Sequence, residues 1–180
     1  MIRHNNPTGL SAMAAFTLFC LPACSARSIE IPKNICDTPV TQGLTAPLLK
    51  PAGELSEWHT TGWGEKGRSV CIVSVDRSEA LRLRVSWHTD SIDPMKYSSL
   101  DNSATGLWEP RRIHHLAESA TLGDNGSIAT TRCKGKGKWN FTLALKVTRD
   151  RKIVHQRKAI DKFMRAYMPA TMKTVGCTPP

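Results

Sequence analysis

The 180-residue chain lacks the short motifs that mark the commonest hydrolases and nucleotide-binding enzymes. It contains no G-x-S-x-G, no H-E-x-x-H, no P-loop and no G-x-G-x-x-G pattern. A cysteine–histidine catalyst would need a free thiolate, and we expect the cysteines of the mature chain to be oxidised. These absences argue against the usual hydrolases and identify no catalytic residue. They leave open carboxylate or histidine chemistry assembled from distant positions.

Closely spaced cysteine pairs and a second long apolar run are also missing. No two cysteines after residue 24 lie within thirty residues of each other, whereas a four-thiolate zinc site usually needs C-x-x-C pairs. We therefore predict neither a metal nor a cofactor. After residue 23 no apolar stretch approaches the roughly 20 residues that span a bilayer.

One apolar run is present, between residues 12 and 23, and Arg3 precedes it. It is shorter than a membrane span and has no polar face of helical period, but its length suits the core of a signal peptide. We interpret residues 1–23 as an export signal rather than a buried first helix, and residues 24–34 as a tether. The sequence LPAC, ending at Cys24, resembles the lipobox of bacterial lipoproteins, from which Pro22 departs. Lipidation at Cys24 would give a cell-membrane lipoprotein, and cleavage after Ser25 or Ala26 would give a secreted protein.

The remaining length is typical of one domain, which we place at residues 35–180. An even number of cysteines in an exported chain predicts two disulfides, and four cysteines allow three pairings. We favour Cys36–Cys71 and Cys133–Cys177, because each pair brackets one half of the chain. Each bond would close a loop of about 35 to 45 residues, which the loop-entropy model values at about 3–4 kcal/mol.

Positive charge dominates the composition, with 25 Lys and Arg against 15 Asp and Glu and a net charge of +10. Such an excess favours anionic partners, here lipid head groups or a cell-wall polymer. Nucleic acid is a weaker match, since it calls for exposed aromatics among the basic residues. The lysines of KGKGK, residues 134–138, have Trp139 beside them, but we expect this tryptophan to be buried in a strand.

Period-two alternation predicts two β-hairpins. Residues 70–75 and 80–88 form the first, in which Leu81, Leu83 and Val85 alternate with polar residues. Residues 127–133 and 138–147 form the second, with an expected buried stripe at Trp139, Phe141, Leu143, Leu145 and Val147. We expect loop over 54–69 and an irregular stretch with one unplaced short element over 89–125.

Two segments have helical spacing. Residues 37–50 predict a short helix broken near Pro47 or Pro51, and residues 151–167 predict a longer one with Ile160, Phe163 and Tyr167 on its apolar face. Pro169 should end that helix or begin a further turn. The expected fold class is α+β: an antiparallel sheet of hairpins with a C-terminal helix on one face, stapled by two disulfides.

Several clusters are candidates for binding. Arginine holds phosphate or carboxylate by two-pronged hydrogen bonding, so we take as candidate anion-binding residues Arg82, Arg84, Arg111 and Arg112. His114 and His115 lie beside the last two. His88, Asp90 and Asp93 would suit a metal or an acid–base set, but a polar loop with an aspartate cap explains them as well. Trp58, Trp63 and Trp108 fall in expected loops, where they are free to contact a ligand, and Trp87 belongs to the core.

The segments ICDTPV and LLKPAGEL, the hairpin VCIVSVDRSEALRLRVSW and the closing FMRAYMPATMKTVGC resemble small exported proteins and lipoproteins of actinobacteria without an assigned activity. The resemblance implies a secreted or membrane-anchored domain and transfers no catalytic residue. Our leading hypothesis is an exported, non-enzymatic cell-surface domain that binds an anionic ligand or partner. The alternative is a basic secreted enzyme acting on an anionic polymer.

Overall fold

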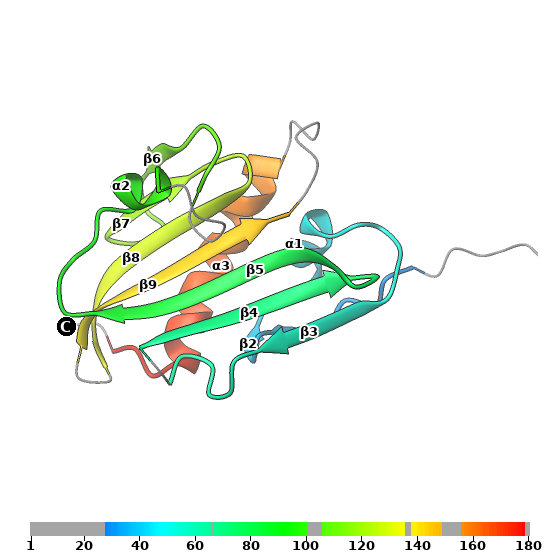
Figure 1. Cartoon of the computed structure of the whole chain (residues 1–180), viewed down its shortest axis with the longest axis horizontal. Helices are drawn as coiled ribbons and strands as arrows, with labels where there is room; N and C mark the ends of the chain where they lie inside the picture. Colours follow the sequence, from blue (N-terminus) through cyan, green and yellow to red (C-terminus); the bar gives the residue numbers. More distant parts are fainter. Residues whose placement is uncertain (1–27, 66, 101–105, 136–137, 149–155, 179–180) are drawn as a thin grey trace, which may run out of the picture.

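A seven-stranded antiparallel sheet with one long helix across its back forms the body of the protein in a computed structural model (Figure 1). The structure describes residues 28–65, 67–100, 106–135, 138–148 and 156–178. Cys24 and the predicted export signal lie outside these ranges. The strand order is β3-β4-β5-β9-β8-β7-β6. The strands are β3 (Leu55–His59), β4 (Arg68–Val75), β5 (Ser78–His88), β6 (Arg111–Ile113), β7 (Ser119–Leu122), β8 (Gly126–Gly135) and β9 (Lys138–Val147).

Both predicted hairpins are present and are longer than expected. Asp76 and Arg77 link β4 to β5 with φ angles of 50° and 61°, the left-handed pair that a two-residue type I′ turn requires. Leu81, Leu83, Val85 and Trp87 of β5 are buried, as the alternation predicted. Strand β5 pairs with β9 from Leu81 to His88, and this pairing joins the two hairpins into one sheet.

The apolar stripe of β9 departs from expectation at one position. Phe141, Leu143, Leu145 and Val147 are buried, but Trp139 is 57% exposed and Lys134 lies 5.8 Å from its ring centroid. Trp139 follows the first residue of β9, at the end of the hairpin, so the helix that covers the rest of the stripe does not reach it. The prediction of a buried Trp139 is therefore wrong.

The segments expected to be irregular hold more structure than the sequence indicated. Residues 55–59, expected as loop, form the edge strand β3, whose central three residues are exposed and so show no alternation. Between β5 and β8 lie the helix α2 (Pro94–Ser98) and the strands β6 and β7. Asp93 caps α2 by accepting a hydrogen bond from the Met95 amide, 2.9 Å away.

The predicted helices are confirmed with shifted limits. Residues 42–48 hold α1 (Gln42–Thr45) and the 3-10 helix η1 (Ala46–Leu48), while α3 runs over Gln156–Thr174. Pro169 lies inside α3 and does not end it, so of the two expectations for this residue the helix end is wrong. Residues 151–155 of the predicted helix lie outside the described ranges. Gly176, with φ 70°, ends α3, and the Cys177 amide donates to the Met172 carbonyl at 2.8 Å, as in a Schellman cap.

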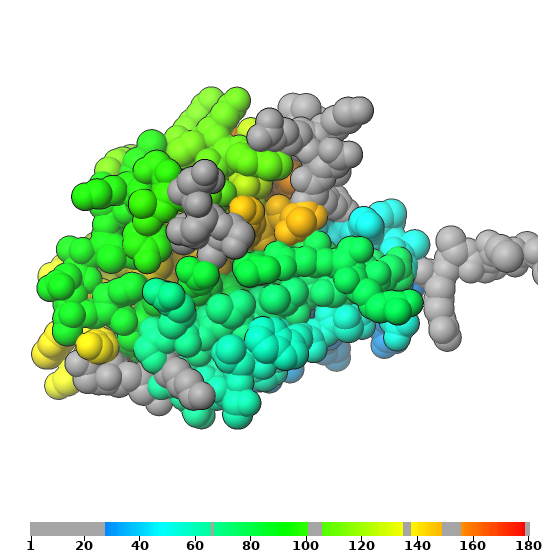
Figure 2. Space-filling model, in the orientation of Figure 1, coloured from blue at the N-terminus to red at the C-terminus, as the bar shows by residue number. Residues whose placement is uncertain are grey.

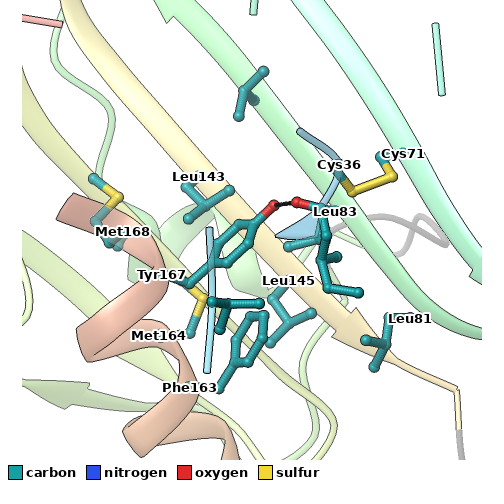
Figure 3. Packing of buried hydrophobic residues seen from close by; sticks show 14 of the residues in the cluster. Cys36, Cys71, Leu81, Leu83, Leu143, Leu145, Phe163, Met164, Tyr167 and Met168 are labelled. Carbon is teal, nitrogen blue, oxygen red and sulfur yellow. Dashed lines mark hydrogen bonds between the residues drawn. A yellow bond between two sulfur atoms is a disulfide. The ribbon is translucent and has the colours of Figure 1, made fainter. Parts of the chain in front are cut away.

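Helix α3 packs its apolar side on one face of the sheet and forms the core (Figure 3). Phe163, Met164 and Tyr167 are fully buried, and Figure 3 shows them beside Leu143 and Leu145. The Tyr167 hydroxyl donates a 2.8 Å hydrogen bond to the Ile35 carbonyl, in the small hairpin of β1 (Asn34–Ile35) and β2 (Thr38–Pro39).

Two disulfides, Cys36–Cys71 and Cys133–Cys177, close the fold. The first ties the β1–β2 hairpin to β4, and the second ties β8 to the chain that follows α3. They confirm the favoured pairing, and the sheet with its C-terminal helix confirms the α+β class. Within the predicted tether, Ile29 and Ile31 pack against the core, and Ser28 bridges to Ala52.

Candidate functional site

The sheet has a second face, opposite α3, and its chemistry differs from that of the core. We call it the outer face; it is the face turned toward the viewer in Figures 1 and 2. Side chains alternate between the two faces along each strand. The outer face therefore carries the polar positions of β5 and their cross-strand partners in β4 and β9. Four basic residues of this face form what we call the basic cluster: Arg68, Arg84, His88 and Lys138.

The strand register brings the basic cluster together. Arg84 and His88 lie on the same side of β5 with Ser86 between them, and Arg68 of β4 is the cross-strand partner of Ser86. Lys138 lies two residues before Asn140, the partner of His88 in β9. Neighbouring strands are about 4.8 Å apart and alternate residues about 7 Å apart. Strands β4 and β5 thus contribute three positive side chains around the small Ser86, which is 8% exposed, and Lys138 of β9 lies near His88.

The electrostatics of the basic cluster are those of crowded like charges. Burial lowers the pKa of the Arg84 guanidinium, and the positive charge of Arg68 lowers it further. Burial also lowers the pKa of His88, followed by the charges of Arg68 and Lys138. The Arg84 Nε and His88 Nε2 atoms are buried and have no hydrogen-bond partner among the described residues. In that part of the chain no carboxylate forms an ion pair with any member of the basic cluster.

The other arginines predicted to bind anions are engaged elsewhere. Arg82 hydrogen-bonds Glu79 through Nε at 3.0 Å, and Arg112 pairs with Asp93 at 2.7 Å. Arg111 lies 4.0 Å from a Glu109 carboxylate oxygen, and its register partner is Leu122, a residue of the core face. The four predicted arginines therefore do not form one site, and Arg84 is the member that lies in the basic cluster.

The predicted histidine and aspartate set divides between two roles. His88 belongs to the basic cluster, whereas Asp93 caps α2 and pairs with Arg112. Among the described residues, the one group of three metal-ligating side chains with ligand atoms within 4.8 Å is Cys36, Glu57 and Cys71. Its two cysteines form a disulfide, and Glu57 accepts a hydrogen bond from the Cys36 amide at 2.9 Å.

The tryptophans separate into buried and exposed sets. Trp63 and Trp87 are buried, and the Trp87 indole donates to the Gly64 carbonyl at 3.0 Å. Trp58 is 59% exposed on β3, opposite Ile72 and therefore on the outer face. The histidines 114 and 115 are exposed, and their backbone carbonyls accept hydrogen bonds from Arg165 of α3.

Sequence reasoning missed Arg68 and Lys138 as site residues. Arg68 lies two positions before the predicted strand 70–75, and extending the alternation back by two residues would have placed it on the face of Val70 and Ile72. Lys138 was grouped with the lysines of the connecting loop, although it is the first residue of β9. The limits of the strands, rather than their existence, concealed the cluster.

Comparisons of the chain with family models, with curated proteins and with solved structures find no match. The function is therefore argued from the geometry of the chain itself. Within the described ranges, no helix combines the length and the apolar character needed to cross a membrane.

Proposed function

We propose that the chain is an exported, non-enzymatic domain, held at the cell membrane by a lipid on Cys24, that binds an anionic ligand at the basic cluster. The observation that carries the proposal is the grouping of Arg68, Arg84 and His88 around Ser86 with no acidic partner in the described part of the chain. The two disulfides are compatible with an extracytoplasmic location, where such bonds persist.

Electrostatics supports an anion as the missing partner. Like charges held close together and partly desolvated favour their neutral forms, which is the direction of the pKa shifts of Arg84 and His88. A carboxylate or phosphate among them would reverse this effect and accept charge-assisted hydrogen bonds from the guanidinium groups. Repulsion between the positive charges thus destabilises the free site, and a bound anion would offset this repulsion.

A binding role is favoured over catalysis by the state of the nearby carboxylates. Glu79, Asp93 and Glu118 are each held in an ion pair with an arginine. Arginine hydrogen bonds are the main cause that lowers the pKa of Glu79 and Asp93, and the Arg132 backbone amide is the main cause for Glu118. Carboxylates held ionised in this way are poor general acids, since a general acid needs a raised pKa.

Calorimetric titration with tripolyphosphate tests the binding site. The double variant Arg68→Gln/Arg84→Gln should bind at least tenfold more weakly than the native chain. A matched control, Arg77→Asn/Lys173→Gln, removes two positive charges from the β4–β5 turn and from α3 and should change affinity less than twofold. Equal losses in both double variants, or no binding to the native chain, would overturn the proposal.

Metabolic labelling with a fatty-acid analogue tests the anchor. The native chain should carry the label, and Cys24→Ala should lose it. A native chain that carries no label would make the protein a free secretion and would remove the anchor from the proposal.

A further inference from the structure

A polar groove lies on the outer face next to the basic cluster, between residues 91–93, which precede α2, and the strands β7 and β8. Its volume is about 580 Å³, and Ile92 is the one apolar side chain among the described residues that line it. Ligand pockets for apolar molecules are lined mainly by hydrophobic side chains, so this groove fits a polar ligand. Its principal lining residues are Asp93, Arg112, Glu118, Thr130, Arg132 and Asn140.

The charges that line the groove cancel in pairs. Asp93 and Arg112 are 2.7 Å apart, and Arg132 Nε lies 2.9 Å from Glu118. The pKa values of Asp93 and Glu118 are both lowered, so these acids stay ionised in their pairs. The groove therefore offers hydrogen-bond donors and acceptors without net charge, the chemistry that complements hydroxyl groups rather than a second anion.

The groove and the basic cluster adjoin. Asn140 lines the groove and is also the register partner of His88, and its amide donates to the Thr89 carbonyl at 3.0 Å. Two residues further along β9, Thr142 is the register partner of Thr130 in β8 and of Ser86 in β5, whose own partner in β4 is Arg68. This register places Arg68 about 14 Å from Thr130, three strand spacings of about 4.8 Å, across the buried side chains of Thr142 and Ser86.

We infer that the anionic ligand is an acidic glycan. Its sugar hydroxyls occupy the uncharged groove, and its carboxylate or phosphate groups meet Arg68, Arg84 and His88. A ligand with both features uses the two adjoining surfaces at once, whereas a bare anion uses the basic cluster alone and a neutral sugar uses the groove alone. This inference rests on the proposed function, because it names the ligand of the same site.

Three probes of three units each separate the two contributions: trigalacturonate, maltotriose and tripolyphosphate. Calorimetric titration of the native chain should show trigalacturonate binding at least tenfold more tightly than maltotriose. Arg68→Gln/Arg84→Gln should weaken trigalacturonate and tripolyphosphate alike, by at least tenfold.

The groove is tested by Glu118→Ala/Arg132→Ala, which removes an exposed ion pair and leaves the net charge unchanged. It should weaken trigalacturonate about tenfold and leave tripolyphosphate within twofold. Glu109→Ala/Arg111→Ala, a second exposed pair removed at constant charge outside the groove, is the matched control and should change neither. Thermal unfolding of each variant confirms that it is folded.

The outcomes distinguish the two proposals. If tripolyphosphate binds through the basic cluster but trigalacturonate binds no better than maltotriose, or the groove variant changes neither probe, the glycan inference fails and the proposed function stands. If no probe binds, or maltotriose binds as tightly as both anions, the proposed function fails with it.

Discussion

The two faces of the sheet are built from the same strands and have opposite chemistry. On the α3 face, Leu83, Leu143 and Leu145 meet Phe163 and Tyr167 in a closed apolar core. On the outer face, the alternate residues of β5 are Arg82, Arg84, Ser86 and His88. The buried Tyr167 hydroxyl has a hydrogen-bond partner. Among the described residues, buried nitrogens without a partner occur on both sides of the sheet, in Arg84 and His88 on the outer face and in Trp63 of the core cluster. The α3 face is thus apolar, whereas the outer face carries the positive charges of the basic cluster.

Removing an aromatic ring should show the largest difference between the faces. Phe163→Ala should lower the free energy of unfolding by about 3–5 kcal/mol, because it leaves a cavity in the core. Trp58→Ala, on the outer face, should change it by less than about 1 kcal/mol, since that ring is mostly exposed. Chemical denaturation of both variants measures the contrast, and equal losses would contradict it.

Removing a single hydroxyl sharpens the same comparison. Tyr167→Phe should cost about 1–2 kcal/mol, because the buried Ile35 carbonyl loses its donor. Tyr97→Phe, in α2 on the outer side, removes the same atom from a half-buried ring and should cost less than about 0.5 kcal/mol. Urea midpoints compare the two variants, and a larger loss for Tyr97→Phe would show that the outer face also contributes to stability.

Substitution of two arginines on the same side of β5 should change the free energy of unfolding differently. Arg82→Gln should destabilise the fold by about 1 kcal/mol, since it breaks the ion pair with Glu79. Arg84→Gln should leave the free energy of unfolding within about 0.5 kcal/mol or raise it, because it removes a partly buried charge among like charges. Losses of the same size would mean that Arg84 has a stabilising partner.

The smallest expected effect is the pH dependence from His88. Its pKa in the folded chain is lowered below the ordinary value of 6.5 by burial, Arg68 and Lys138. The unfolded chain therefore binds the proton first as pH falls, so this contribution to stability is complete above pH 6.5 and declines below it. Asn140 also faces His88 and carries no charge.

Denaturation between pH 5 and 8 measures this contribution as the difference between the native chain and His88→Gln. The native chain should lose more stability than the variant as the pH falls. Parallel curves, or a larger loss in the variant, would show that the pKa of His88 is not lowered.

Much of the fold could be predicted from the sequence, because it depends on local signals. Alternation over 80–88 placed Leu83 and Val85 in the core, and the spacing of the cysteines favoured the pairing that the structure contains. Strand β3 could not be predicted, because an exposed edge strand has no buried side to produce alternation. Trp139 satisfied the pattern of its strand, but the pattern does not show where the covering helix ends.

The site was less predictable, since its members come from different strands. Arg82, Arg84 and Arg112 look equivalent in the sequence. Glu79 and Asp93 pair with Arg82 and Arg112, and Arg84 has no ion pair within the described ranges. Strand register decided that Arg68 would lie beside Ser86.

The sequence by itself determined the hydrophobic alternation, the helix and the excess of positive charge, because each depends on residues close together in the chain. Tertiary structure decided which of those charges are paired and which stand together. Ion pairing depends on distances of a few ångströms between side chains from separate strands, and those distances exist only once the sheet has formed.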